Sequence, residues 1–283
     1  MSTAAIEAGA AAATASRTFD PYAPPPPAPA WRFLHGIGPL AKIAGPLPAM
    51  IALVLVRDLA TPATFLLLGY AVLLIGARLS GWMLSALLLG VPVFLVLVGF
   101  GFALWTDPSR IATDVVALRV GGVVLYGAAL EIGFATALRL GAILVLALIG
   151  GLTTTGPDLT RALVQQLRVP YRIGYTALAA LRFVPRFGRE LEVIRAAHRV
   201  RGAAQGRGPI AAARRRLGYV VPLLAGAIRH AERVALAMDA RAFGAHPHRT
   251  ERHVVPWRVR DTVFVAAFWA VSVALFAVLH PWG

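Results

Sequence analysis

Long apolar stretches, separated by short polar breaks, dominate the chain between about residue 40 and residue 153. The clearest is Trp82–Trp105, which has 24 residues, no charged side chain and a tryptophan at each edge. A helix of that length crosses the hydrocarbon core of a bilayer, and tryptophan is enriched where the core meets water. The pattern therefore predicts a transmembrane helix over residues 82–105.

The remaining apolar stretches are shorter or carry isolated charges. Arg57, Asp58 and Pro62 divide one stretch into two short spans, which form a predicted hairpin. Because Arg119 and Glu131 interrupt another stretch, its first part is predicted to be partly amphipathic. The expected segments are 43–57, 62–77, 118–136, 138–153 and 262–280. The sequence thus predicts an all-α integral membrane protein with five transmembrane helices, or six, together with amphipathic helices outside the membrane.

Composition agrees with this class and divides the chain into four regions. The chain is 58% hydrophobic, only 14% charged and has a mean hydropathy of +0.69. Residues 1–32 are rich in Ala and Pro and predict a disordered cytoplasmic tail. Residues 33–154 hold the N-terminal transmembrane helices, 155–260 form an Arg-rich cytoplasmic domain, and 261–283 hold the C-terminal transmembrane helix.

The positive charge is concentrated in one region. The formal net charge is +15, and residues 155–260 contribute +14 through 20 Arg and six acidic residues. Basic residues are retained on the cytoplasmic side of bacterial and eukaryotic membranes. We therefore expect a multi-pass protein of the cell membrane whose residues 155–260 face the cytoplasm.

Two amphipathic helices are predicted within the basic region, over residues 189–201 and 219–241. Their apolar residues recur with helical spacing, and each helix ends close to an arginine, Arg201 in the first and Arg241 in the second. Gly202 supplies a stop signal after the first helix, and the second is predicted to end near residues 242–244.

Several kinds of chemistry are absent from the sequence. The chain has no cysteine, no phosphate-binding loop of the G-x-x-x-x-G-K-[ST] type and no H-E-x-x-H motif. His246, His248 and His253 have no carboxylate at a useful spacing. We expect no catalytic residues, no metal site and no cofactor.

Two other functions remain open at this point. A self-contained secondary transporter or channel would show inverted repeats, and none is evident. A binder of nucleic acid or anionic lipid would use the +14 region electrostatically, but its arginines alternate with apolar residues in helical register, which favours packed helices.

Five ordered segments resemble the transmembrane T component of energy-coupling-factor (ECF) transporters, the EcfT/CbiQ family. Two of them are the arginine signatures at the ends of the amphipathic helices. The segments are His35–Lys42, Thr153–Leu159, Leu181–Leu191, Arg195–Gly202 and Ala231–Gly244. The signatures depart from the family's Ala-Arg-Gly: the first reads Val200–Gly202 and the second Ala240–Ala242. Since alanine adopts a left-handed backbone less easily than glycine, the second helix is expected to end at Gly244.

The resemblance implies a scaffold without enzymatic activity. Its partners would be two cytoplasmic ABC ATPase subunits, which bind the ATP, and a membrane S component for a vitamin or a transition-metal ion; the bilayer surrounds it, and no nucleic acid is bound. The resemblance makes Arg201 and Arg241 the ATPase-docking residues, flanked by Val200, Gly202, Ala240 and Ala242.

The acidic residues of the basic region could either support docking by the two arginines or pair with them in place of docking. Glu232 and Asp239 are expected to support docking by orienting neighbouring arginines, unless they belong to a solvated face. Alternatively, Arg201 and Arg241 pair with a nearby acid such as Glu192 or Asp239, or simply face water.

Overall fold

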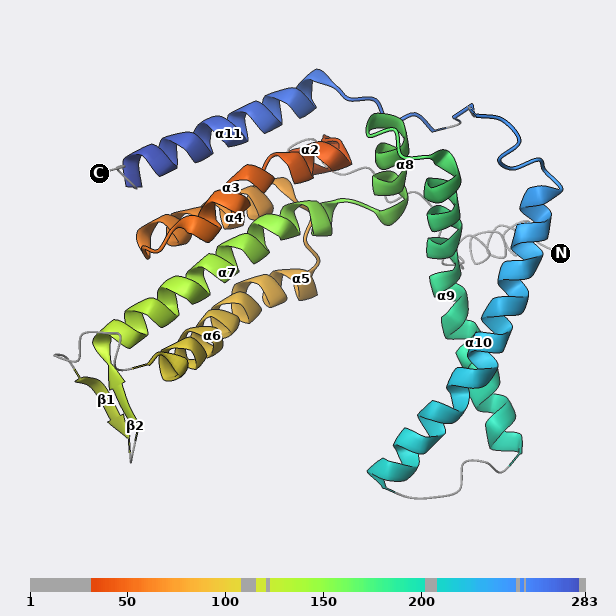
Figure 1. Cartoon of the computed structure of the whole chain (residues 1–283), viewed down its shortest axis with the longest axis horizontal. Helices are drawn as coiled ribbons and strands as arrows, with labels where there is room; N and C mark the ends of the chain where they lie inside the picture. The colour runs from red at the N-terminus through yellow and green to blue at the C-terminus, as the bar shows by residue number, and fades with distance from the viewer. Residues whose placement is uncertain are drawn as a thin grey trace, which may run out of the picture. The chain divides into compact units, whose positions relative to one another are not determined.

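The computed structural model of the protein describes residues 32–107, 116–120, 123–201, 208–247, 250–251 and 253–279. The predicted tail, residues 1–32, lies outside this part except for Arg32. The elements, in chain order, are η1 Phe33–Gly36, α2 Pro39–Ala44, α3 Leu47–Leu55, α4 Ala60–Gly76, α5 Gly81–Ser85, η2 Ala86–Gly90, α6 Val91–Trp105, β1 Val116–Val120, β2 Val123–Tyr126, α7 Gly127–Thr153, α8 Gly156–Gln166, α9 Tyr171–Val200, α10 Pro209–Asp239 and α11 Val259–Leu279 (Figure 1).

Among the described residues, three helical stretches are long and apolar enough to cross a membrane: Gly81–Trp105, Gly127–Thr153 and Val259–Leu279. Two shorter apolar helical stretches, Pro39–Leu55 and Ala60–Gly76, correspond to the predicted hairpin. The expected class, an all-α multi-pass membrane protein, is confirmed.

The prediction of an amphipathic helix over residues 118–136 is wrong in its first half. Strands β1 and β2 pair antiparallel there, with Val120 opposite Val123, and α7 begins only at Gly127. The reason is visible in the sequence, because valines flank Gly121–Gly122 on both sides. Valine favours strands, and a Gly-Gly dipeptide is typical of a two-residue hairpin turn.

Helix α7 is the centre of the apolar helices and packs against both α4 and α6 (Figure 1). Its small residues allow close approach: a Cβ atom added at Gly133 would lie 2.4 Å from the carbonyl oxygen of Gly99 on α6. Phe65 of α4 and Leu146 of α7 are fully buried in the shared core. This packing fixes the end of α7, where the functional region begins.

The two amphipathic helices are much longer than predicted. Helix α9 begins at Tyr171 instead of residue 189, and α10 begins at Pro209 instead of residue 219. Each helix contains an internal proline, Pro185 in α9 and Pro222 in α10. In a sequence, a proline usually predicts a helix boundary or a kink, but both helices continue through theirs. Before α10, Gly208 has a φ of +108°, which glycine adopts without strain.

Candidate functional site

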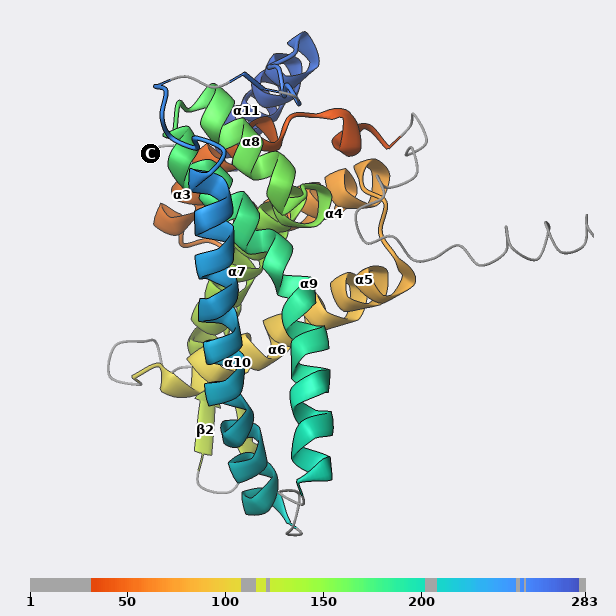
Figure 2. The same ribbon diagram turned by 90° about the vertical axis from the view of Figure 1, so that its right-hand side faces the viewer.

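Helices α9 and α10 run antiparallel to each other (Figure 2). Three ring contacts establish this, because the residue numbers rise on one helix as they fall on the other. The ring centroids are 5.2 Å apart between His198 and Tyr219, 4.2 Å between Phe183 and His230, and 5.7 Å between Tyr171 and Phe243. The C-terminal end of α9 therefore lies at the opposite end of the pair from the C-terminal end of α10.

This arrangement separates the two signature arginines. Arg201 follows α9 directly, and Arg241 follows α10. Since α9 has 30 residues and a helix rises 1.5 Å per residue, the two ends are about 45 Å apart along the pair. Two arginines that lie so far apart cannot bind the same small ligand, whereas they can contact two separate protein subunits.

The end of α10 has a defined backbone motif. The Phe243 amide donates to the Met238 carbonyl at 3.0 Å, and the Ala242 amide donates to the Asp239 carbonyl at 2.9 Å. This pair of bonds is the Schellman motif that ends many helices, with the left-handed residue next to last. The left-handed residue here is Ala242, with a φ of +53°. The expectation that the helix ends at Gly244 is wrong, because the backbone motif enforces the turn at Ala242 despite its Cβ.

The Schellman motif places Arg241 at the cap of the helix. The segment beyond it is held to the start of α9, since the Arg172 side chain donates to the Gly244 carbonyl and the Tyr171 hydroxyl donates to the His246 carbonyl at 2.6 Å. The backbone around Arg241 is thus fixed while its side chain remains exposed.

Both signature arginines are exposed and unpaired in the described part of the chain. Neither the Arg201 nor the Arg241 side chain has a hydrogen bond or an ion pair there, with Glu192 or Asp239 or any other described residue. Their flanking residues Val200, Ala240 and Ala242 are exposed as well, and Val200 is 89% exposed. Gly202, the remaining flanking residue, lies outside the described residues.

The two acidic residues that were expected to orient arginines are also exposed. Glu232 and Asp239 form no ion pair with any described residue. Among the described residues, an ion pair does join Asp158 and Arg161 on α8, at 2.9 Å. The geometry therefore places both acids on the solvated surface of α10.

A row of exposed apolar side chains lies on the side of α10 that faces away from α9. We call it the apolar stripe; its members are Leu217, Val221, Leu224 and Ile228, which are 51–73% exposed. Their spacing of four, three and four residues places them on one helical face. Tyr219 and His230, which contact α9, lie on the opposite face. A contiguous exposed apolar face of this kind marks an interaction surface.

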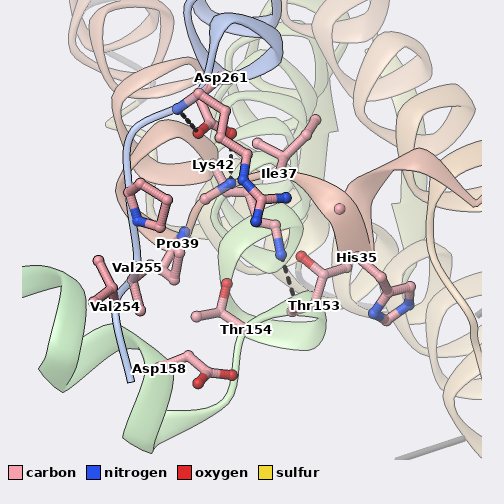
Figure 3. A pocket seen from close by; sticks show the side chains of 14 residues that line it. His35, Ile37, Pro39, Lys42, Thr153, Thr154, Asp158, Val254, Val255 and Asp261 are labelled. Carbon is pink, nitrogen blue, oxygen red and sulfur yellow. Dashed lines mark hydrogen bonds between the residues drawn. The ribbon is translucent and has the colours of Figure 1, made fainter. Parts of the chain in front are cut away.

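A polar junction lies where the membrane helices meet the segments that lead to α9 and α10 (Figure 3). We define it by Gly38, Lys42, Thr153, Asp158 and Asp261, which line a cavity of about 240 Å³. These residues come from the start of α2, the end of α7, the start of α8 and the start of α11. Two of the segments that carry the family resemblance, His35–Lys42 and Thr153–Leu159, thus meet in space.

Hydrogen bonds to buried charges hold the polar junction together. The Lys42 ammonium, on a residue only 3% exposed, donates to the Thr153 carbonyl at 2.8 Å. Asp261 is 1% exposed and accepts from the backbone amides of Gly38, at 2.6 Å, and Arg258, at 2.8 Å. Lysine next to the last carbonyls of a helix also interacts favourably with the negative end of the helix dipole.

His35 lies beside this cavity and accepts a hydrogen bond from the Arg78 amide through its Nε2 atom, at 3.0 Å. Partial burial and the nearby charges of Lys42, Arg32 and Arg78 lower the pKa of His35 below its usual value of 6.5. The imidazole is therefore neutral near pH 7, which is the form that can accept this bond.

Sequence reasoning missed the role of Asp261. The available signal was an acidic residue at the very edge of an apolar span, because an ionisable group there is costly unless it is hydrogen-bonded. It also missed Gln165, whose side chain binds the backbone of residues 253–255.

In the described residues we find no group of three or more His, Asp and Glu side chains that could hold a metal ion. His246 and His253 are exposed, and His248 lies outside the described part.

Comparison with known proteins identifies the family. Residues 30–252 match the family described as cobalt transport protein, CbiQ. The energy-coupling factor transporter transmembrane protein EcfT of Staphylococcus aureus is 27% identical over 257 residues, which cover 88% of this chain and 93% of that protein. EcfT of Exiguobacterium sibiricum is 28% identical over 258 residues, 87% of this chain and 95% of that protein.

A third relative has a different name. A protein of Bifidobacterium longum named as an ABC transporter ATP-binding protein is 29% identical over 260 residues, which cover 88% of this chain but only 32% of that protein. Since the family match extends over most of the chain and the apolar helices agree with a membrane component, the chain belongs to the CbiQ family of transmembrane components of ECF transporters.

Proposed function

We propose that this chain couples ATP hydrolysis by two ABC ATPase subunits to the uptake of a vitamin or a transition-metal ion through a membrane S component. It binds no ATP itself, and Arg201 and Arg241 are its docking points for the ATPases. The observation that carries the proposal is the placement of these two exposed, unpaired arginines at opposite ends of one antiparallel helix pair.

The chemistry of arginine supports this role. A guanidinium presents a fixed fork of donors that matches a carboxylate, and it stays charged when a partner covers it. A hydrogen bond to a charged group contributes about 1.5–3 kcal/mol, so two docked arginines would contribute about 3–6 kcal/mol to assembly. Because neither arginine has an internal partner among the described residues, docking breaks no existing ion pair there.

The apolar stripe offers a second contact surface. Two ATPases bound at the ends of the pair leave the middle of α10 uncovered, and the stripe occupies that middle. Removing apolar surface from water is favourable by about 25 cal/mol per Å², before the entropic costs of association are subtracted. We propose that the membrane S component covers this stripe.

The B. longum relative agrees with a partnership between chains of this kind and ATPases. That protein carries a segment similar to nearly all of this chain, while about two thirds of its own length lies outside the match. A protein that is named for ATP binding and contains such a segment favours ATP hydrolysis as the energy source. The +14 charge of residues 155–260 supports the cytoplasmic side for α8, α9 and α10, where ATP is available.

The experiment is isolation of the complex from its host through a tag on this chain. We expect the wild-type chain to bring down two ABC ATPase subunits and a small membrane protein, identified by mass spectrometry. The Arg201→Ala, Arg241→Ala double variant should retain less than a tenth of the ATPase. A matched control carries Arg189→Ala and Arg229→Ala, which remove two exposed arginines from the same helices about three turns before their ends. Equal loss of ATPase in the control and in the double variant would contradict the proposal.

A further inference from the structure

Only two connections of the polypeptide join the coupling helices α9 and α10 to the membrane helices. One leads from the end of α7 through Thr153–Asp158 into α8, and the other returns through residues 254–261 into α11. Residues of both connections line the cavity of the polar junction. Any motion that passes along the chain from α9 or α10 into the membrane therefore passes this junction.

Helix α8 holds the two connections together. It packs against α9, and its Gln165 side chain binds the return segment twice: Nε2 donates to the His253 carbonyl at 2.8 Å, and Oε1 accepts from the Val255 amide at 2.7 Å. The neighbouring Gln166 donates to the Val255 carbonyl at 2.9 Å. The Gln165 amide group thus donates to and accepts from the return segment, as the backbone of a neighbouring strand would. Because these bonds hold the return segment to α8, we expect the two to move together.

Helix α2 connects this unit to the membrane helices. It packs against α7, α8 and α11. At its start, the Gly38 amide binds Asp261 at the beginning of α11, and within it Lys42 binds the Thr153 carbonyl at the end of α7. A displacement of α8 must either carry α2, α7 and α11 with it or break these bonds.

Burial makes breaking them unfavourable. Lys42 and Asp261 are 3% and 1% exposed, and a charge that is so largely removed from bulk water is destabilised when it loses the hydrogen bonds that satisfy it. Both oxygens of Asp261 accept a backbone hydrogen bond, one from Gly38 and one from Arg258, so moving either segment away leaves a buried carboxylate oxygen without its donor. The bonded arrangement therefore transmits force instead of yielding to it.

We propose that the polar junction is the relay through which the coupling helices move the membrane helices, and that Lys42 and Asp261 are its positioning residues. This inference rests on the proposed function, since it assumes that ATPases move α9 and α10. It assigns to these two residues a role in transmission, separate from docking at Arg201 and Arg241.

The test uses the full complex with its ATPases and S component, reconstituted in liposomes. The chain has no cysteine, so two introduced cysteines are the only thiols of this subunit, which is spin-labelled before the complex is assembled. Leu67 on α4 and Leu236 on α10 are 67% and 68% exposed and offer labelling sites on the two sides of the junction. The measured quantity is the change in the label-to-label distance when MgATP and vanadate are added.

We expect Lys42→Met and Asp261→Asn to keep the ATPase content of the complex and to hydrolyse MgATP within twofold of the wild-type rate. The nucleotide-dependent distance change should fall to less than half, with a broader distance distribution. Lys42→Arg, which keeps the charge and the donor, should restore most of the change. Ser272→Ala removes a buried hydroxyl from α11 away from the junction and should leave all three quantities unchanged.

Two results would overturn the inference. One is a wild-type distance change in Lys42→Met, which would show that the junction is not needed for transmission. The other is a loss of ATPase content in parallel with the distance change, which would show a general structural role. Failure of the proposed function gives a different result, because the arginine variants would then keep their ATPases whatever the junction variants do.

Discussion

The strained backbone at Ala242 leads to a sharp prediction about the end of α10. Ala242→Gly removes the Cβ atom from a residue whose φ is +53°, within a Schellman motif that holds Arg241 at the helix cap. A non-glycine residue in the left-handed region costs about 1–2 kcal/mol. We therefore expect glycine to stabilise the helix end and to hold Arg241 more firmly in place.

The magnitude is smaller than the full cost of the strain. Glycine also increases the freedom of the unfolded chain, which offsets about 0.4–1 kcal/mol. The net stabilisation should be about 0.5–1 kcal/mol. Since 1.4 kcal/mol is a factor of ten, the equilibrium constant for local opening of the helix end should fall about two- to fivefold. The effect should be local, because the side chain of Ala242 is exposed and supports no packing.

Amide hydrogen exchange in detergent measures this directly. The Ala242 and Phe243 amides donate the two bonds of the motif, so both should exchange two to five times more slowly in Ala242→Gly. The matched control is Ala240→Gly, two residues earlier, where φ is −61° and the backbone is right-handed. There glycine relieves no strain and should speed exchange by a similar factor. Faster exchange in both variants would refute the assignment of strain to Ala242.

Two further predictions concern the membrane helices and the junction. Because the pKa of His35 is lowered, the unfolded chain binds a proton below pH 6.5 more readily than the folded chain does, so stability should fall as the pH drops through this range. Thermal unfolding in detergent at pH 7.5 and pH 5.5 should show a lower midpoint at pH 5.5, and His35→Gln should reduce the difference; an unchanged difference would contradict this reading. Gly133→Ala should destabilise the α6–α7 contact by about 1–3 kcal/mol, because its Cβ would meet the Gly99 carbonyl at 2.4 Å. Gly101→Ala, with nothing within 4 Å of its added Cβ, should leave the midpoint within a degree or raise it, and equal effects of the two would argue against the close packing.

The apolar helices could be predicted from the sequence because the bilayer imposes a simple requirement on them. A span needs length and the absence of charge, and Trp82–Trp105 satisfies both without reference to any other part of the chain. The strands near Val120 and Val123 were missed because helix and strand patterns overlap in short apolar runs that carry isolated charges. The early start of α9 was hidden by Pro185, which the long helix accommodates.

The candidate site divides in the same way. Local periodicity and stop signals place Arg201 and Arg241 close to the ends of two predicted helices, whereas the turn at Ala242 was not predicted and the docking role is what the family resemblance implies. The contact between Gly38 and Asp261 joins residues 223 positions apart, and that between Lys42 and Thr153 joins residues 111 positions apart. Only the packing of α2 against α7 and α11 brings these groups together, and no local pattern records it.

Site-specific photocrosslinking tests the central claim most directly. A photoreactive amino acid is placed at Val200 or at Ala240, which are exposed and adjacent to Arg201 and Arg241, so that both arginines remain intact. A third position, Val221 in the apolar stripe, serves as the comparison. In the complex isolated with its ATPases, we predict crosslinks to an ATPase subunit from positions 200 and 240, and crosslinks to the S component from position 221. Absence of any ATPase crosslink from positions 200 and 240, in a complex that contains the ATPases, would contradict the assignment of these helix ends as docking points.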